Sequence, residues 1–515
     1  MKLAAIDIGS NSIHMVVVRH GGDQVIEVVD REKDMVKLGA GAFRNSRLTD
    51  DAFAAGVDSL VKFRKIIDHH RVEQIIAVAT SAVREAANGD AFLAEVKRRT
   101  GIVPRTISGI EEARLIHTAV RSAIDLAGKR ALCLDIGGGS VEVVVGDASK
   151  VTFAASLALG VQRLRDRIGE DDPLTREQRR QLDKLIEAEA SAALRKAHDA
   201  GFELCVGTSG TILGLGLAVH LARGNERWIS PHGRIVPLSE LRQKTEELAG
   251  MDADERNRVP GIDFERTDTV HIGGLLLVRL LEMAEAESIK LCDSSVREGL
   301  VIEAIEKSNG KRTGSARQTD IRRQSVMGLL RRCGQDNEHS RLISTLSLQL
   351  FDGTRTIHRF GDSERMLLDY TALMHDVGRH ISFERHEQHS HYIIRHGDLL
   401  GFSNEEVDLM AIIARFHRKA KPKPRHHEYA ALTPVQQRMV TLHAGILRVA
   451  EGLERRHAQV VESLSCEVTP KKVRLCVVAR GDAEVEIWAA QRKSSLLARA
   501  LDRRIEVELT EESRV

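Results

Sequence analysis

Two aspartates, each ending an apolar segment and each followed by a turn rich in Gly and Ser, are the first residues whose spacing suggests chemistry. Such a turn exposes backbone N–H groups and hydroxyls, and these groups bind phosphate. A carboxylate beside that phosphate would repel it unless a cation lay between them, and Mg²⁺ accepts carboxylate and phosphate oxygens. We therefore expect Asp7 and Asp135 to bind Mg²⁺ directly or through water, with Glu142 reaching the same ion. The turn residues expected around phosphate are Gly9, Ser10, Asn11, Ser12, Gly137, Gly138, Gly139 and Ser140.

A pair of adjacent carboxylates, Glu111 and Glu112, suggests a general base. The spacing from Ser108 to Glu111 predicts a capping box, in which Ser108 caps a helix and Glu111 closes back on it. This role leaves Glu112 free to polarise an attacking water. Arg84 is predicted on the first turn of a helix capped by Thr80 or Ser81, where it can bind phosphate oxygens bidentately. A solvated surface arginine is the alternative interpretation.

An internal repeat predicts how these side chains are positioned. Residues 4–17 and 132–145 align at a constant offset of 128, with Asp7 over Asp135 and Ser12 over Ser140. Each copy reads as an apolar strand, an Asp, a permissive turn and a second β-branched strand, which is a hairpin. Two copies indicate duplicated domains that face each other across a cleft. Two unrelated hairpins with a common turn explain the shared register less well.

The rest of the chain predicts four domains. Helices at 50–69, 81–100 and 111–126 alternate with strands at 74–79 and 103–107, and the order after the second repeat is similar, which indicates an α/β architecture. A polar break precedes a helical, histidine-rich segment, and the C-terminal segment predicts strands at 473–478, 483–488 and 505–509 with a helix at 494–501. The predicted boundaries are 1–127, 128–306, a linker 307–317, an all-α domain 318–457, and a small α+β cap 458–515.

Six motifs occur in a fixed order in the first 305 residues, and together they are specific. They are DIGSNS (7–12), ATSAVREAAN (79–88), SGIEEARLI (108–116), DIGGGSVE (135–142), GTSGTI (207–212) and SSVREGL (294–300). This series resembles the exopolyphosphatase / guanosine pentaphosphate phosphohydrolase (Ppx/GppA) family. The resemblance implies two actin/Hsp70-like (RNase H-like) domains.

The resemblance also implies roles for individual residues. Glu112 would be the base, Arg84 would bind the terminal phosphate, and Asp135 and Glu142 would hold Mg²⁺ or Mn²⁺, with K⁺ as a further candidate cofactor. Gly207, Thr208 and Ser209 join the expected phosphate-binding residues. The implied reaction is an in-line attack of water that releases terminal orthophosphate from inorganic polyphosphate, with pppGpp 5'-phosphohydrolase as a related activity. The implied assembly is a homodimer.

The histidine-rich segment carries a second resemblance. His339, the His375–Asp376 pair and a late carboxylate are similar in order to the metal-binding residues of the HD phosphohydrolase superfamily, with Glu451 at the position of the usual late Asp. A second divalent metal is therefore expected at these four residues, and His389 and His417 are additional candidate ligands. A scaffold without metal is the alternative, since a buried histidine is often only a satisfied polar residue.

Composition and charge argue against several classes of protein function. The formal net charge is +2 and aromatic residues make up 3%, so neither coating of nucleic acid nor base stacking is expected. Six scattered cysteines, no basic leader and no apolar run of ~18 residues predict a cytoplasmic protein without a membrane partner. The basic run 415–427, with Lys419, Lys421 and Lys423, is either solvated surface or, if folded over the cleft, an attractor of polyanions.

Three other functions remain compatible with some of these features. An actin-fold kinase or ATPase shares the hairpins, but the Glu112 motif favours a water-activating base. A phosphate or nucleotide sensor without catalysis would not need Asp7, Glu112, Asp135 and Glu142 together. Finally, the main activity could belong to the histidine-rich domain as a nucleotide phosphohydrolase.

Overall fold

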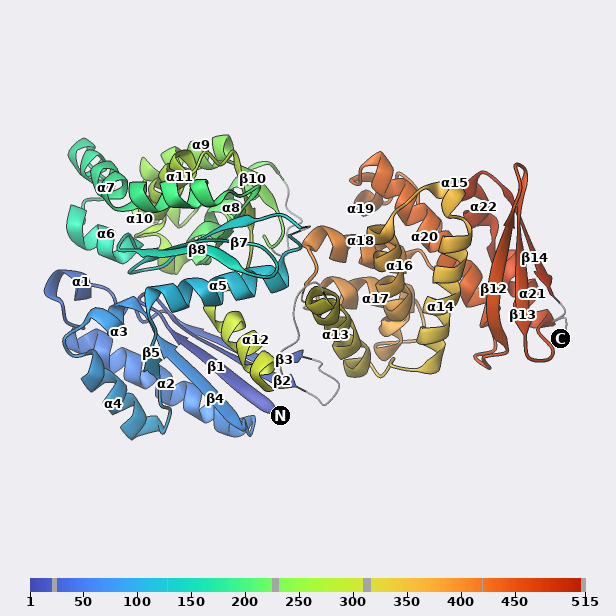
Figure 1. Ribbon diagram of the computed structural model, residues 1–515, viewed down its shortest axis with the longest axis horizontal. Helices are drawn as coiled ribbons and strands as arrows, with labels where there is room; N and C mark the ends of the chain where they lie inside the picture. Colours follow the sequence, from blue (N-terminus) through green and yellow to red (C-terminus); the bar gives the residue numbers. More distant parts are fainter. Residues whose placement is uncertain are drawn as a thin grey trace. The chain divides into compact units, whose positions relative to one another are not determined.

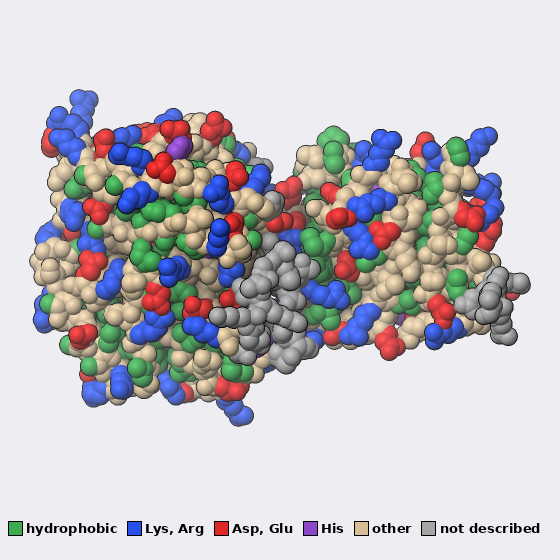
Figure 2. All heavy atoms as spheres, in the orientation of Figure 1, with side chains coloured by type: hydrophobic (Ala, Val, Ile, Leu, Met, Phe, Trp, Pro, Cys, Tyr) green, Lys and Arg blue, Asp and Glu red, His purple; other side chains and the backbone are tan. Residues whose placement is uncertain are grey.

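The computed structural model describes residues 1–20, 26–126, 128–224, 231–308, 316–397, 399, 401–418 and 420–510. It divides into two compact units (Figure 1). The first comprises Met1–Ile321 with Gly401–Asn404, and the second comprises Arg322–Leu400 with Glu405–Val515. No helix among the described residues is long and apolar enough to cross a membrane. On the face drawn in Figure 2, acidic and basic side chains are intermingled over both units, as the small net charge would suggest.

The first unit begins with a five-stranded sheet of order β3-β2-β1-β4-β5. In the predicted hairpin, β1 and β2 run antiparallel with Asp7 opposite His14, and β1 runs parallel to β4. The strands are β1 (Lys2–Ile8), β2 (Ile13–His20), β3 (Ile26–Asp34), β4 (Gln74–Ala79) and β5 (Arg105–Thr106). The helices of this half are α1 (Ala42–Asn45), α2 (Asp50–His69), α3 (Ser81–Glu85), α4 (Gly89–Thr100) and α5 (Gly109–Ala123).

A second, six-stranded sheet repeats this plan with the order β10-β11-β9-β6-β7-β8. Its hairpin places Asp135 opposite Glu142, and β9 runs parallel to β6 as β4 does to β1. The strands are β6 (Ala131–Ile136), β7 (Val141–Gly146), β8 (Val151–Leu157), β9 (Leu204–Thr208), β10 (Ile235–Pro237) and β11 (Ser288–Leu291). The helices are α6 (Val161–Ile168), α7 (Arg176–Ala200), α8 (Gly210–Ala222), α9 (Leu238–Ala249), α10 (Ala253–Arg256), the 3₁₀ turn η1 (Phe264–Arg266), α11 (Val270–Met283) and α12 (Val296–Ser308).

Two helices lie between the sheets and join the halves into one body. Helix α5 follows the first sheet in sequence but packs on β7 and β8 of the second, whereas α12 follows the second sheet and packs on β1 and β2 of the first (Figure 1). The two helices also pack on each other, and one apolar cluster contains residues of both helices and both sheets. Residues 1–127 and 128–306 therefore form two sheets with a common core.

The second unit is helical and ends in a three-stranded sheet of order β12-β13-β14. Its helices are α13 (Ala316–Arg332), α14 (Glu338–Gly353), α15 (Arg355–His358), α16 (Asp362–Met374), the 3₁₀ turn η2 (Val377–His380), α17 (His386–Arg395), α18 (Asn404–Arg415), α19 (His427–Ala430), α20 (Pro434–Leu453), α21 (Glu484–Lys493) and α22 (Ser495–Leu501). The strands are β12 (Val461–Val468), β13 (Lys472–Ala479) and β14 (Arg504–Leu509).

Several predicted elements need correction. The strand predicted at 483–488 is wrong, because these residues begin α21, and the real first strand of the cap is β12. Ala489 and Ala490 of α21 are buried, and a Cβ at Gly452 of α20 would lie 2.5 Å from the Ala490 Cα, so close helix packing decides this segment. The helix predicted at 81–100 divides into α3 and α4. Within the predicted linker, residues 309–315 lie outside the described residues, and both flanks are helical.

Candidate active site

A cavity of about 280 Å³ lies in the first unit where the two hairpin turns meet. Its walls come from the ends of β1, β6 and β9 and from the first turns of α3, α5, α8 and α12. Asp7, Glu112 and Asp135 all line it, together with most of the turn residues expected to bind phosphate. The predicted convergence of the two Asp hairpins on one space is therefore what the structure shows.

Glycines allow the two turns to touch. Each turn is closed by the same hydrogen bond, from Gly9 N to Ser12 O at 3.1 Å and from Gly137 N to Ser140 O at 3.0 Å. A Cβ at Gly138 would lie 3.1 Å from the backbone N of Asn11 in the other turn, so a larger residue would separate the turns. The backbone of each turn consequently remains directed at the same cavity.

The Ser10 hydroxyl caps α3 from the neighbouring turn. Ser10 Oγ accepts a hydrogen bond from Ala82 N at 3.1 Å and lies 2.8 Å from Ser81 Oγ. Thr80 holds the predicted N-cap position but makes no side-chain capping bond; that bond comes from Ser10, a residue distant in sequence. Arg84 lies in the last turn of this five-residue helix rather than in the first, because α3 ends at Glu85.

Four carboxyl groups in and behind the cavity have raised pKa values, and burial is the largest cause for each of them. Burial, reinforced by Asp135, raises the pKa of Asp7 to about 7. Burial and Asp135 also raise the pKa of Glu142 to about 8, against a hydrogen bond of 2.8 Å from Ser156 Oγ. The pKa of Asp135 is raised by burial and lowered by hydrogen bonds from Thr208 Oγ1 at 3.0 Å and Ser295 Oγ at 3.1 Å. Such a group of buried carboxyl groups favours binding of a cation.

Glu112 lies in the first turn of α5. Ser108 caps this helix as predicted and accepts a hydrogen bond from Glu111 N at 3.1 Å. Glu111 does not complete the predicted capping box, because its carboxylate pairs with the exposed Arg105 guanidinium at 2.6 Å. Burial first, and then the charges of Glu142 and Asp7, raise the pKa of Glu112 well above its usual range. Arg84 Nη1 lies 3.5 Å from Glu112 Oε2 and donates to the Ile107 carbonyl at 2.7 Å.

Several polar residues of the cavity wall were not predicted from the sequence. Arg297 Nη1 donates to His14 Nδ1 at 2.7 Å, and His14 Nε2 in turn lies 2.7 Å from Ser12 Oγ. Burial and Arg297 lower the pKa of His14 to about 3, so a neutral imidazole links the arginine to the turn at residues 9–12. Arg297 belongs to the quoted motif at 294–300 and was therefore accessible to sequence reasoning. Lys33 and Arg266 also line the cavity, without any sequence signal.

The other predicted residues divide into two that line the cavity and four that lie behind its wall. Thr208 and Ser209 line it at the start of α8, where Ser209 has a φ of 85° and accepts a hydrogen bond from Ile212 N at 3.4 Å. Gly207 is a packing residue, since a Cβ there would lie 2.4 Å from Ile289 Cδ1. Arg84, Gly139 and Glu142 were also predicted as site residues, and they too lie behind the cavity wall.

The oxygen-rich cavity fits a hard divalent cation. Asp7 Oδ1 and Glu112 Oε2 are buried atoms without a hydrogen-bond partner, and all four acidic side chains offer oxygen. Among the described residues, the compact groups of metal-ligating atoms are found in the second unit and not here. A cation at Asp7 and Asp135 would therefore complete its coordination with water and phosphate oxygens, which is the usual mode of Mg²⁺.

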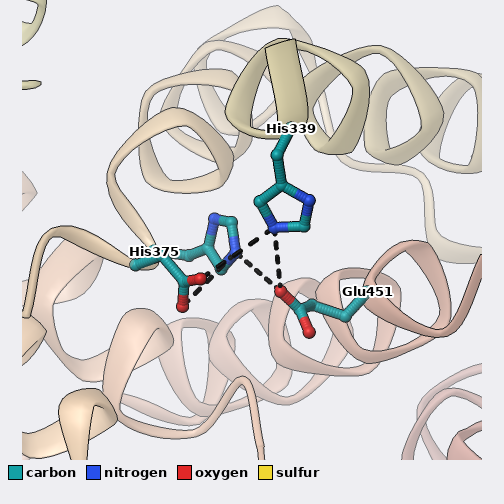
Figure 3. Close-up of side chains that lie close together, drawn as sticks. His339, His375 and Glu451 are labelled. Carbon is teal, nitrogen blue, oxygen red and sulfur yellow. Dashed lines mark hydrogen bonds and ion pairs between the residues drawn. The ribbon is translucent and has the colours of Figure 1, made fainter. Parts of the chain in front are cut away.

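The predicted second cluster forms within the second unit. His339 on α14, His375 after α16, and Glu451 on α20 point toward one another, as Figure 3 shows. The His375 Nε2 atom lies 2.8 Å from Glu451 Oε1, and His339 Nε2 lies 3.4 Å from it. Asp376 completes the predicted set. His417, an expected additional ligand, lies in an adjacent group with Asp376 and His386; His389 does not belong to either group.

The basic run also lies largely in the second unit. Arg415 pairs with Glu428 at 2.6 Å, and Lys421 and Lys423 are exposed. Lys419 lies outside the described residues. The expectation that this run attracts polyanions stays a prediction.

Comparisons with known proteins agree over most of the chain. Residues 16–308 match the Ppx/GppA phosphatase family, and residues 321–490 match Ppx/GppA phosphatase, domain III. The guanosine-5'-triphosphate,3'-diphosphate pyrophosphatase of Vibrio vulnificus is 31% identical over 420 residues, which are 81% of this chain and 80% of the relative. The protein of the same description from Photobacterium profundum is 29% identical and covers 83% of each chain.

Two solved structures are similar to a large part of this chain. An exopolyphosphatase from Cytophaga hutchinsonii is 26% identical with a TM-score of 0.57, covering 60% of this chain and 98% of that one. A Ppx/GppA family member from Aquifex aeolicus is 27% identical with a TM-score of 0.52, covering 60% and 99%. The predicted fold class is confirmed: two actin-like α/β halves, then a helical region and a small α+β cap.

Proposed function

This chain belongs to the Ppx/GppA phosphatase family, whose reaction is phosphoanhydride hydrolysis, and from that premise we propose that its cavity releases terminal orthophosphate from inorganic polyphosphate. The observation that carries the proposal is the placement of Glu112. Its buried carboxylate lies on the wall of a cavity formed by two phosphate-binding turns, next to Asp7 and Asp135.

The residues of the cavity suggest a direct displacement at phosphorus. Water positioned by Glu112 forms a bond to the terminal phosphorus while its proton passes to the Glu112 carboxylate. The bridging P–O bond breaks, and the electron pair leaves with the shortened chain, which is a weakly basic phosphate. Backbone N–H groups of both turns and the guanidinium groups of Arg266 and Arg297 stabilise the charge on the phosphoryl oxygens. A divalent cation held by Asp7 and Asp135, with Glu142 behind them adding negative charge, would supply Lewis-acid stabilisation of those oxygens.

The lining favours a substrate without a nucleobase. Among the described residues that line the cavity, His14 is the one aromatic side chain, and it is occupied by hydrogen bonds to Ser12 and Arg297. Nothing else there offers a ring for guanine to stack on. The second candidate, pppGpp, is favoured by a different observation, because the Vibrio vulnificus and Photobacterium profundum relatives carry the name of a pppGpp pyrophosphatase.

Phosphate release from the two substrates tests the proposal. We expect the protein with Mg²⁺ to release orthophosphate from long-chain polyphosphate with a higher kcat/KM than from pppGpp, and Glu112→Gln to lower both rates together. A higher kcat/KM for pppGpp would make the second candidate the main function. Absence of turnover on either substrate would reject the hydrolase and favour a phosphate sensor.

Binding of Mg²⁺ is expected to release protons near neutral pH. With pKa values of about 7 and about 8, Asp7 and Glu142 are partly protonated there, and a cation favours their ionised forms. The affinity for Mg²⁺ should therefore rise as the pH increases from about 6 to about 8.5 and then level off. Calorimetric titrations near pH 7 in buffers of different ionisation enthalpy should give different binding enthalpies. Equal enthalpies in all buffers would contradict the raised pKa values.

A further inference from the structure

A group of histidines in the second unit goes beyond the four ligands predicted from the sequence. Two sets of metal-ligating atoms occur there: His339, His375, Asp376 and Glu451 in one, and Asp376, His386 and His417 in the other. In each set all ligand atoms lie within 4.8 Å of one another. Asp376 belongs to both sets, so the two sets describe adjacent positions with a shared carboxylate.

The backbone fixes the ring orientation of these histidines. His375 Nδ1 lies 2.6 Å from the Ala372 carbonyl, and His417 Nδ1 lies 2.6 Å from the Ala414 carbonyl. A carbonyl oxygen only accepts, so each Nδ1 carries a hydrogen. Each Nε2 then faces a carboxylate oxygen: Glu451 Oε1 lies 2.8 Å from His375 Nε2, and Asp376 Oδ1 lies 3.5 Å from His417 Nε2. His386 Nδ1 lies 3.0 Å from the Phe383 carbonyl, with Arg418 Nη1 farther away at 3.3 Å. An imidazole held in this way by its other nitrogen is typical of metal ligands.

Asp376 lies at the centre of the histidines. Its Oδ1 is 2.9 Å from His386 Nε2, 3.5 Å from His417 Nε2 and 3.6 Å from His375 Nε2. Its Oδ2 lies 2.6 Å from Arg379 Nε and 3.9 Å from His339 Nε2. Asp376, His386 and His417 are at most 2% exposed.

Apart from the 2.8 Å hydrogen bond between His375 Nε2 and Glu451 Oε1, these contacts are not aligned as hydrogen bonds. The two carboxylate oxygens of Asp376 and the Nε2 atoms of His339, His386 and His417 are buried without an aligned hydrogen-bond partner. Buried polar groups without partners are costly, and four imidazoles around two carboxylates exceed what simple ion pairing needs. A cation placed between these atoms would accept their lone pairs and remove that cost.

We propose that the second unit holds a pair of divalent transition-metal ions bridged by Asp376. His339, His375 and Glu451 bind one ion, and His386 and His417 bind the other. Imidazole nitrogen with carboxylate oxygen selects Mn²⁺, Fe²⁺, Co²⁺ or Zn²⁺ rather than Mg²⁺. Arg379 beside Asp376, and Lys493 Nζ at 3.6 Å from Glu451 Oε2, are positioning residues that hold the carboxylates.

This site is independent of the proposed polyphosphate site. The first unit presents oxygen ligands of the kind that suit Mg²⁺, whereas the second presents a mixed nitrogen and oxygen set. The chain would therefore carry two kinds of metal centre, and the loss of either one leaves the other to be measured.

Titration of the chelator-treated full chain with Co²⁺ tests the proposal. The titration is done in an Asp135→Asn background, so that the first-unit cavity contributes little, and is followed by visible absorption of Co²⁺ and by elemental analysis after desalting. We expect two equivalents bound per chain. The double variant His386→Gln/His417→Gln should retain one equivalent, and Asp376→Asn should lose both.

Matched controls separate ligand loss from unfolding. His389 lies three residues after His386 in α17 but belongs to neither set of metal-ligating residues. The His389→Gln variant should therefore keep two equivalents. Circular dichroism and thermal unfolding of each variant establish that it is folded. Two equivalents in the folded His386→Gln/His417→Gln variant would overturn the second ion position. No bound Co²⁺ in the background protein would overturn the whole centre and leave a purely structural cluster.

Discussion

Glu112→Gln is expected to lower kcat for terminal phosphate release by about 10²–10⁴-fold, the usual contribution of a general base. Glutamine keeps the shape of the side chain but cannot accept a proton from water. KM should stay level or fall, because the change also removes one negative charge from a buried group that includes Asp7 and Glu142. Steady-state kinetics on long-chain polyphosphate with saturating Mg²⁺ measure both constants.

The neighbouring residue supplies the control. Glu111 lies in the same helical turn, but its carboxylate pairs with Arg105 at the surface. Glu111→Gln should therefore retain kcat within about twofold, since a surface ion pair contributes little. A Glu112→Gln variant with wild-type kcat would show that some other group activates the water, and the mechanism above would be wrong.

Asp135→Asn is expected to remove most of the Mg²⁺ response. Metal stabilisation of developing charge contributes several kcal/mol, so kcat/KM should fall by on the order of 10²–10³-fold. The wild type should gain Tm on addition of Mg²⁺, because a ligand that binds only the folded state stabilises it. The variant should show a much smaller gain at the same Mg²⁺ concentration. Thermal unfolding and Mg²⁺ titration of the activity measure these effects.

Removing a hydroxyl that donates to Asp135 separates the effect of the Asp135 charge from the effect of its position. Thr208 and Ser295 each donate a hydrogen bond to Asp135 Oδ2. Ser295→Ala leaves the carboxylate in place and should cost far less than Asp135→Asn, while still showing the Mg²⁺-dependent gain in Tm. If Asp135→Asn kept the wild-type Mg²⁺ half-saturation, Asp135 would not be a ligand of the cation.

The local and repeated features of this protein could be predicted from its sequence. The constant offset between the Asp7 and Asp135 segments gave the two hairpins, and the apolar periodicity gave α2 and β4 with their observed limits. Glu112 was identified because Glu111 was assigned to a capping box; the structure does not show that box, but it places Glu112 on the cavity wall. Each of these inferences needs only neighbouring residues or a repeat of the same pattern.

Features that depend on distant contacts could not be predicted. The cap of α3 comes from Ser10, 71 residues earlier in the chain, and no local pattern shows this pairing. His389 was named instead of His386 because the sequence does not reveal which residue of α17 turns its ring toward Asp376. The segment 483–488 alternates like a strand over only six residues, and packing of α21 on α20 decides its conformation.

The exchange of α5 and α12 between the two sheets has a consequence for how this protein can be divided. A fragment ending after α5 would keep that helix without β7 and β8 and would uncover Leu3, Ala5 and Val16 on the face that α12 protects. The complementary fragment would expose Val144 and the apolar side of α12. Separate expression should therefore give insoluble pieces, whereas co-expression of both fragments should restore a folded heterodimer by complementation.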